Sequence, residues 1–518
     1  MQTEIYLDTN ATSPVLPAAA AAAMAAMQDG FGNPSSSHAT GLRARALRES
    51  VRASAGRVVG AGEGRLMFNS GATEGIQTAV LSALCAVRER RARGEACGDI
   101  VLIGATEHKA VPESLAHWNR LLGTGLELRV LPVDGDGRHR LDVLRALAPR
   151  AALVCTMAAN NETGVVSDLR GIEAVLRDTG SDALWLVDCV QALGKLPLDL
   201  AASRIDYAPF SGHKLYAPKG IGMLYVRRGA PYTPLMCGGG QEDGQRSGTE
   251  NMAGIAALGA VFSALERGDT FRDGAALLAC RARLVAALEA ALPGIVFNAP
   301  MAQSLPTTIN FSVPDVASAT LLDLFDAAGM RVSAGSACSA GKAGSSYVLD
   351  AMGVPAWRSA AAVRLSFGAL FDDASLDLAC ERIARCGAAL AAPMPMPMPG
   401  AEPAMDGVID SAMLVPADAA RDWLAVHPEA LVIDVRDLRE HSVASTGTGG
   451  GAVRLHGHAV RNVPLACVAD HAPQWLGVAA PLLFVCRSGA RSARAAQALR
   501  ALGHPGAWSL VGGFALAI

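Results

Sequence analysis

Short apolar runs alternate with segments of helical pattern along most of the chain. Apolar runs that end in small or polar residues, such as RLMFNS (65–70), DIVLIGAT (99–106) and AALVCTMAAN (151–160), are typical of buried strands. The segments that follow the first two, GATEGIQTAVLSAL (71–84) and EHKAVPESLAHW (107–118), are typical of helices. This rhythm predicts an α/β domain with a largely parallel sheet.

A proline-rich segment divides the chain. AAPMPMPMPGAEPAMDG (391–407) alternates proline with methionine, so it cannot form a helix interior and predicts an extended, semi-stiff spacer. The part that follows repeats the rhythm in ALVIDVRD, PLLFVCRSG and AWSLVGG. The length of 518 residues exceeds that of most single domains. We therefore expect a large α/β domain at 1–390 and a compact α/β domain at 408–518.

The composition argues against several classes of protein. The net charge of -3 gives no electrostatic reason to expect binding to nucleic acid or to an anionic membrane. A run of about 18 uncharged apolar residues is absent from the sequence, so we expect no membrane-spanning helix. The 11 cysteines form no C-x-x-C pair, which argues against a metal site or a disulfide framework and favours small buried hydrophobes. The alanine-rich stretch 18–26 predicts a surface helix of a cytoplasmic protein.

An aspartate and a lysine in the large domain indicate cofactor chemistry. Asp188 ends a buried strand in WLVDCVQALGKLPLDL, Gln191 follows three residues later, and Lys214 lies in an SGHK turn. A lysine that forms a Schiff base with an aldehyde, with a carboxylate for the ring nitrogen, is what pyridoxal phosphate chemistry requires. Taken alone, an aspartate and a lysine at this spacing are more often a surface pair.

Two further motifs favour the cofactor. NSGATEG (69–75) follows a strand and opens a helix, which places backbone N–H groups and the Thr73 hydroxyl where phosphate binds well; an ordinary helix start is the alternative. TEHKAV puts His108 at the next strand-to-helix turn, where an imidazole could stack on a pyridine ring; a solvated loop histidine is the alternative.

Together the motifs resemble one family. IYLDTNATSP, GNPSSSH, SGATEG, TEHKAV, NNETG, VDCVQALGKLP, SGHKLYAPKG, RSGTEN and GSACS occur in the order, and near the spacing, of the NifS/IscS-type cysteine desulfurases, over residues 4–390. The resemblance implies a homodimeric fold-type I enzyme, similar to class V aminotransferases, that uses pyridoxal 5'-phosphate to remove sulfur from L-cysteine and release L-alanine. The chain departs from the family's LDNNATTP at Thr9 and Ser13.

The resemblance also implies residue roles. Lys214 would be the Schiff-base lysine, Asp188 would pair with the pyridine nitrogen, Gln191 would meet the phenolate oxygen, and His108 would stack on the ring. The remaining cofactor-binding positions are Ala72, Thr73, Asn161, Ser211, His213 and Thr249 of the partner subunit. The substrate-binding positions are Asn10, Asn161 and Arg364, the last as a bidentate clamp on the carboxylate.

A second catalytic element surrounds Cys338. SAGSACSAGKAGSSYVLDAMG (333–353) is rich in glycine, serine and alanine, and it predicts a mobile loop. A desulfurase needs such a loop, because its cysteine attacks the sulfur of the bound substrate and carries the persulfide outward. A buried structural cysteine fits this composition poorly. The loop resembles the longer one of the NifS/IscS subgroup, which favours delivery to several acceptors.

The smaller part of the chain has a cysteine loop of its own. Cys486 follows the apolar run PLLFV and precedes a helical segment, so the loop would aim its backbone N–H groups inward as an anion cradle. The residues of this cradle are Arg487, Ser488, Gly489, Ala490 and Arg491. Surroundings with two arginines lower the pKa of a thiol. A buried cysteine ahead of a solvated basic helix is the alternative.

Residues 408–518 resemble a rhodanese domain, a sulfurtransferase module. The resemblance rests on DVR (434–436), the Cys486 loop and LVGG (510–513), and the loop has the rhodanese length, one residue shorter than in related phosphatases. A glycine-rich insertion at 445–458 leaves open whether His456 or His458 fills the family's histidine position. The short segment after VGGF leaves the customary final helix shortened or absent.

Joining the two parts predicts a sulfur relay. Cys338 would pass its persulfide to Cys486, which would offer it to a low-molecular-weight thiol such as glutathione, to cyanide, or to a sulfur-carrier or iron–sulfur scaffold protein. Tethering raises the effective concentration of the second site, to about millimolar for a short flexible linker. Three alternatives stay open: a C-terminal domain that only docks an acceptor, direct supply of an iron–sulfur scaffold without Cys486, and a selenocysteine lyase or other fold-type I enzyme, which would not need Cys338.

Overall fold

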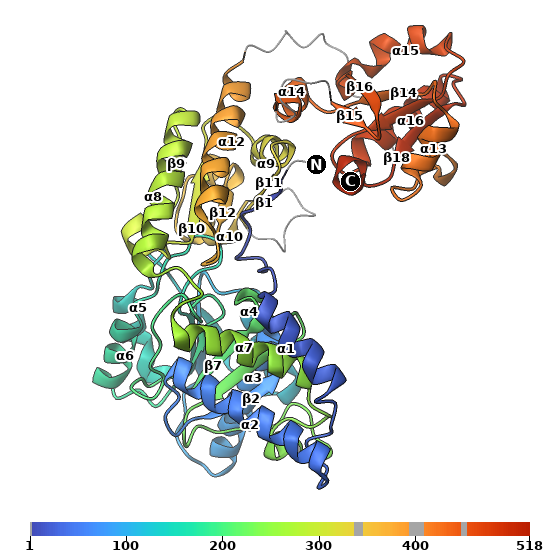
Figure 1. Cartoon of the computed structure of the whole chain (residues 1–518). Helices are drawn as coiled ribbons and strands as arrows, with labels where there is room; N and C mark the ends of the chain where they lie inside the picture. The colour runs from blue at the N-terminus through green and yellow to red at the C-terminus, as the bar shows by residue number, and fades with distance from the viewer. Residues whose placement is uncertain (1–2, 336–344, 393–408, 447–452, 518) are drawn as a thin grey trace.

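The computed structural model describes residues 3–335, 345–392, 409–446 and 453–517 (Figure 1). The expected spacer, Cys338 with its neighbours and the middle of the 445–458 insertion lie outside these residues. Among the helices that are described, none combines the length and the apolar character that a membrane crossing needs.

The large domain is built on a mainly parallel sheet with the strand order β2-β8-β7-β6-β5-β3-β4. The strands are β2 (Arg65–Asn69), β3 (Ile100–Gly104), β4 (Glu127–Leu131), β5 (Ala151–Met157), β6 (Leu184–Asp188), β7 (Tyr207–Ser211) and β8 (Gly222–Val226). The pairs from β4 to β7 are parallel, and β8 is antiparallel to both of its neighbours. The predicted α/β fold with a largely parallel sheet is therefore confirmed.

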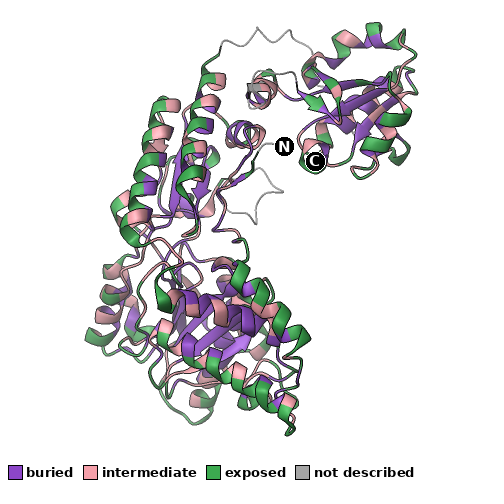
Figure 2. Cartoon of the chain, viewed as in Figure 1, coloured by how far each residue is buried: buried purple, intermediate pink, exposed green. Residues whose placement is uncertain are grey.

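Helices cover both faces of this sheet. They are α1 (Pro17–Gln28), α2 (Ala39–Val59), α3 (Ala72–Ala92), α4 (Ala110–Leu122), α5 (Leu141–Leu147), α6 (Leu169–Asp178) and α7 (Met252–Arg267). Successive side chains of β3 serve opposite faces: Ile100 and Leu102 join the core under α2 and α7, whereas Val101 and Ile103 join the core under α3 and α4. The buried strands between exposed helix faces stand out in Figure 2.

A second subdomain follows in the chain and also takes up the N-terminal strand. Its sheet has the order β12-β10-β9, and β1 pairs with β11 beside it. The elements are β1 (Ile5–Tyr6), α8 (Gly274–Ala291), β9 (Val296–Phe297), β10 (Thr308–Ser312), α9 (Ser318–Ala327), β11 (Met330–Arg331), α10 (Tyr347–Ala351), α11 (Ala356–Ala360), β12 (Val363–Ser366) and α12 (Asp373–Ala391). Side chains from α8, α9, α12 and the strands form one apolar core.

The C-terminal domain is a smaller α/β unit with the strand order β13-β18-β17-β14-β16-β15. The strands are β13 (Leu414–Val415), β14 (Leu431–Asp434), β15 (Arg454–Leu455), β16 (His458–Asn462), β17 (Leu482–Val485) and β18 (Ala507–Leu510). The helices are α13 (Ala420–Val426), α14 (Leu438–Thr446), α15 (Val468–Leu476), α16 (Ala490–Ala501) and α17 (Gly513–Leu516). The strands from β13 to β16 in this order are parallel, and β15 is antiparallel.

The structure tests two expectations from composition, one about the alanine-rich stretch and one about the burial of the cysteines. The alanine-rich stretch forms the surface helix α1, which buries Ala19 and Ala26 and exposes much of the rest. The expectation that most cysteines are buried holds for half of those in the described residues. In the described ranges Cys155, Cys189, Cys280, Cys386 and Cys486 are buried, but the others are half-buried or, at Cys237, exposed.

Candidate active site

A cavity of about 480 Å³ lies at the carboxyl ends of the central strands of the large sheet, where α/β folds usually bind their ligands. The sequence-predicted site residues that line it are Asn10, Ala72, Thr73, His108, Asn161, Asp188, Gln191, Ser211, His213, Lys214 and Arg364. Thr249, which the resemblance assigns to the partner's site, is exposed and does not line this cavity. Segments far apart in the sequence thus place most of the predicted residues around one space.

Lys214 lies in a 3₁₀ turn directly after β7. Its Nζ donates hydrogen bonds to the main-chain oxygens of Asn10 and Ala11, at 2.5 and 2.6 Å. The neighbouring His213 places Nδ1 3.1 Å from the Thr12 hydroxyl. Burial, helped by the charges of Lys214 and a second lysine, lowers the pKa of His213 to about 4, so its imidazole is neutral near pH 7. The N-terminal segment therefore orients the amine in the cavity.

Asp188 ends β6 and is buried in the floor of the site. Its Oδ1 accepts a hydrogen bond of 2.9 Å from the Val190 N–H. Burial raises the pKa of Asp188, and the nearby charges of His108 and Lys214 act against that rise. Burial lowers the pKa of His108, whose Nδ1 accepts a hydrogen bond from the Ala110 N–H at 3.2 Å. The imidazole of His108 and the carboxyl group of Asp188 thus lie at the ends of β3 and β6, which are separated in the sheet by β5.

The first turn of α3 forms an anion-binding edge of the cavity. Gly71 precedes the helix with a φ of 150°, a conformation that side-chain-bearing residues rarely adopt. The backbone N–H groups at this helix start carry the positive end of the helix dipole, and Thr73 adds a hydroxyl. Ser211 and His213 line the same cavity from β7 and the turn that follows it. These donors suit a phosphate group.

Arg364 on β12 is a buried cation with an open donor. Its Nη2 pairs with Asp8 Oδ1 at 2.6 Å, and its Nη1 donates to the Asn161 carbonyl at 3.0 Å. Nε has no hydrogen-bond partner among the described residues, although the side chain is 1% exposed. A buried guanidinium with an unused donor is stabilised by a carboxylate that reaches it. The geometry suits the carboxylate of an amino acid.

For L-cysteine, the substrate that the family resemblance implies, we predict that Arg364→Lys raises the KM about 10- to 100-fold with little change in kcat, because an ammonium cannot form the planar, two-point contact of a guanidinium. Steady-state alanine release measures both constants. Arg358→Lys is the matched control, because Arg358 also donates from Nε and Nη2, to Asn298 and Phe297, but does not line the cavity. An equal KM for Arg364→Lys and the native enzyme would contradict the clamp.

Two charged residues beside the cavity were missed by sequence reasoning: Lys195, which is half-buried, and Glu107, which is buried. Lys195 Nζ donates to Gln191 Oε1 at 2.6 Å and to Asn10 Oδ1 at 3.2 Å, and burial, followed by the charges of Lys214 and Arg364, lowers its pKa to about 7. The sequence feature that could have revealed Lys195 is its position four residues after Gln191, a predicted site residue. Glu107, inside the quoted TEHKAV motif, is the second.

Glu107 is a carboxyl group without an ionic partner in the described structure. Both of its carboxyl oxygens are buried without a hydrogen-bond partner there. Burial and then the charge of Asp188 raise the pKa of Glu107 well above its usual range. Burial therefore disfavours the ionised form of Glu107.

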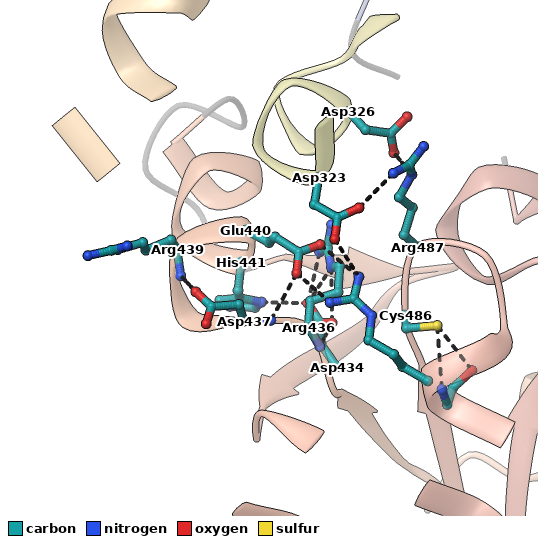
Figure 3. Close-up of polar contacts among 12 residues, drawn as sticks. Asp323, Asp326, Asp434, Arg436, Asp437, Arg439, Glu440, His441, Cys486 and Arg487 are labelled. Carbon is teal, nitrogen blue, oxygen red and sulfur yellow. Dashed lines mark hydrogen bonds and ion pairs between the residues drawn. The ribbon is translucent and has the colours of Figure 1, made fainter. Parts of the chain in front are cut away.

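The Cys486 loop connects β17 to α16, as the sequence predicts (Figure 3). Cys486 Sγ accepts hydrogen bonds from the N–H groups of Gly489, at 3.2 Å, and Ser492, at 3.4 Å. Gly489 has a φ of 92°, and a Cβ there would lie 2.9 Å from the Gly512 nitrogen, so the close turn requires glycine. Backbone donors converge on the sulfur.

Both arginines of this loop lie beside Cys486, as the sequence predicts, and carboxylates pair with them. Arg491 forms a two-point ion pair with Glu440, at 2.6 and 2.9 Å, and Arg487 pairs with Asp323 and Asp326 of α9, at 2.6 and 3.2 Å. Figure 3 shows both carboxylates of α9 directed at Arg487. The local sequence could not reveal these partners, because they come from distant segments of the chain.

Comparisons with known proteins identify both domains. Residues 5–378 match the aminotransferase class-V family, and residues 417–516 match the rhodanese-like domain. A cysteine desulfurase of Gluconacetobacter diazotrophicus is 39% identical over 377 residues, which cover 72% of this chain and 90% of the relative. The solved structure of a NifS-like protein is 30% identical, with a TM-score of 0.65 over 74% of this chain and 98% of that one. A structure of SspA in complex with cysteine is 26% identical, with a TM-score of 0.59 over 70% of this chain and 99% of that one.

Cysteine desulfurases of this family use pyridoxal 5'-phosphate, and the cavity fits that group. It offers an amine at Lys214, a buried carboxylate at Asp188 and a phosphate-binding helix start at α3, and the Asn161 Oδ1 is buried without a partner among the described residues. Arg364 remains for the substrate carboxylate. The chain therefore belongs to the cysteine desulfurases of the aminotransferase class-V family, and it carries a rhodanese-like domain after its desulfurase domain.

Proposed function

We propose that sulfur taken from L-cysteine is carried as a persulfide from Cys338 to Cys486 and then given to a small thiol or to cyanide. The observation that supports this relay is the Cys486 loop, in which the N–H groups of Gly489 and Ser492 point at Sγ. A persulfide on this sulfur carries negative charge, which backbone donors stabilise. The loop belongs to the same chain as the desulfurase that would supply the sulfur.

In the desulfurase step, the cavity residues hold and orient the reactants. When bound, pyridoxal phosphate draws electrons from the substrate carbon attached to nitrogen. Lys214 would hold the cofactor and move protons at Nζ, Asp188 would face the ring nitrogen, Gln191 the phenolate oxygen and His108 the ring. Arg364 would bind the substrate carboxylate, with Asn10 and Asn161 beside it. The phosphate would be held by Ala72, Thr73, Ser211, His213 and Thr249 of the partner subunit.

The sulfur transfers balance without an added oxidant or reductant. The Cys338 thiol accepts the sulfur of cysteine, so that the substrate C–S bond is replaced by a C–H bond and the products are L-alanine and a Cys338 persulfide. The Cys486 thiolate then attacks the outer sulfur of this persulfide. A new S–S bond forms at Cys486, the old one breaks, and Cys338 leaves as a thiolate. Attack by glutathione or cyanide on the Cys486 persulfide gives glutathione persulfide or thiocyanate and restores the thiolate.

We also propose that the enzyme is a homodimer in the cytoplasm. A homodimer would complete each desulfurase cavity with Thr249 of the partner subunit, and a cytoplasmic location would supply glutathione. A sulfur-carrier protein or an iron–sulfur scaffold could receive the sulfur in place of a small thiol. Neither nucleic acid nor a membrane is needed for any of these steps.

The test is the location of sulfur after one turnover with L-cysteine in the absence of dithiothreitol. We predict that peptide mass spectrometry finds persulfides on Cys338 and Cys486 in the native chain, on Cys338 alone in Cys486→Ala, and on neither in Cys338→Ala. Glutathione persulfide formation should fall at least about tenfold in Cys486→Ala, whereas alanine release with dithiothreitol should stay unchanged.

Cys467→Ala is the control for this series, because Cys467 is a half-buried cysteine of the same domain that lies outside the loop. It should leave both persulfides in place. If Cys486 gains no sulfur in the native chain, the C-terminal domain docks an acceptor instead of relaying sulfur. Direct supply of an iron–sulfur scaffold from Cys338 would then be the better account.

A further inference from the structure

The C-terminal domain is attached to the desulfurase domain through α14. This helix packs against α9 and α12 of the second subdomain (Figure 1). Val443 is 2% exposed and belongs to the apolar core of that subdomain, whereas the next residue, Ala444, packs against the core of the C-terminal domain. The Arg439 guanidinium also reaches the carbonyl of Ala392 at the end of α12, at 3.4 Å. One helix thus contributes to two cores.

A second contact lies at the Cys486 loop itself. Asp323 and Asp326 are three residues apart on α9, so they share one face of that helix. Arg487 reaches both, with Nη1 2.6 Å from Asp323 Oδ1 and Nε 3.2 Å from Asp326 Oδ2 (Figure 3). Arg491 Nη2 lies 3.5 Å from the other oxygen of Asp323. The two acids are about three-quarters buried, at 25% and 22% side-chain exposure, so this contact is less screened than a surface ion pair.

The acids on α9 lie close, along the chain, to the nucleophile of the desulfurase. Asp326 pairs with Arg331 of β11 as well as with Arg487, at 2.8 Å from Oδ1 to Nη1. Arg331 precedes Cys338 by seven residues, and an extended chain of that length spans at most about 25 Å. Docking at Asp326 therefore favours transfer from the same chain.

The same contact occupies the arginine that an anion would use. Arg487 directly follows Cys486, and its guanidinium would attract an anionic sulfur donor or acceptor to the loop. While Asp323 and Asp326 hold it, they compete with such an anion. The contact thus favours receipt of sulfur from the desulfurase and disfavours exchange with anions in solution.

We propose that Asp323 and Asp326 form a docking site for the Cys486 loop of their own chain, which aligns Cys486 for loading and competes with small anions for Arg487. This inference rests on the relay proposed above. It names the surface that makes the relay selective for sulfur from the attached desulfurase domain.

The test is the Asp323→Asn/Asp326→Asn double variant of the full-length holoenzyme. The removed charges should slow the single-turnover loading of Cys486 from L-cysteine about tenfold and lower the KM for thiosulfate about threefold or more, with cyanide as acceptor. In the thiosulfate reaction Cys486 attacks the outer sulfur and sulfite leaves. Alanine release with dithiothreitol should not change, because neither acid touches the cavity.

Asp377→Asn is the matched control, because Asp377 pairs with Arg283 in the same subdomain at 2.5 Å and touches no residue of the Cys486 loop. It should leave loading and the KM for thiosulfate unchanged. Native loading in the double variant, or a native KM for thiosulfate, would overturn the docking site. If native Cys486 never gains sulfur from cysteine, the relay is wrong. The KM for thiosulfate in the double variant still shows whether Asp323 and Asp326 bind the Cys486 loop and compete with anions for Arg487.

Discussion

Replacing Lys214 by arginine should lower alanine release from L-cysteine by at least about 10³-fold, the largest loss that we expect from a single substitution in the cavity. Arginine keeps the positive charge, but its guanidinium remains protonated, so it can neither hold the cofactor covalently nor exchange protons at neutral pH. The hydrogen bonds from Nζ to Asn10 and Ala11 show that the native amine is already oriented by the N-terminal segment. Steady-state alanine release and the visible absorbance of the bound cofactor give the two readouts.

Lys219→Arg is the control for this substitution, because Lys219 is an exposed lysine at the edge of the same cavity. It should change alanine release less than about threefold, since surface substitutions have small effects. A Lys214→Arg enzyme that retains a tenth of the native rate would contradict the role of this amine.

Most of the large domain could be predicted because short, continuous stretches of sequence mark its strands and its site residues. Apolar runs that end in small or polar residues mark β2, β3 and β5, and the site residues follow the strand ends in sequence. Parallel strands bring such ends to one edge of a sheet, so Thr73, His108 and Asp188 meet there although they are far apart in the sequence. The same logic places the Cys486 loop between a strand and a helix.

What could not be predicted depends on pairings between distant segments. Asp323 and Asp326 resemble the solvated acids of any surface helix until the Cys486 loop is placed against them. Val443 resembles an ordinary apolar position of α14, yet it completes the core of another domain. Glu107 and Lys195 are charged residues that the local sequence does not distinguish from surface residues, and the pKa shifts that burial causes at both follow from the packing around the cavity.

The substitution Asp188→Asn tests the electrostatics of the cavity and should lower kcat for alanine release about 10²- to 10⁴-fold, with the KM for L-cysteine within about threefold of native. The asparagine oxygen can still accept the hydrogen bond from the Val190 N–H, so the end of β6 should keep its shape. The amide cannot balance a positive charge on the ring nitrogen. Burial already raises the pKa of Asp188, so its ionised form depends on the hydrogen bond from the Val190 N–H and on positive charge nearby, such as that of Lys214.

The matched control for this second substitution lies just before the start of the same strand. Asp182 is an exposed carboxylate that pairs with Arg90 at 2.5 Å, and Asp182→Asn removes the same charge far from the cavity. Its kcat should stay within about twofold of native, because an exposed ion pair contributes little. A native kcat in Asp188→Asn would assign the ring nitrogen to another partner, and Glu107 would be the first residue to examine. Because burial raises the pKa of Glu107, that outcome would also require its proton to leave when the cofactor binds, which a kcat that rises with pH would reveal.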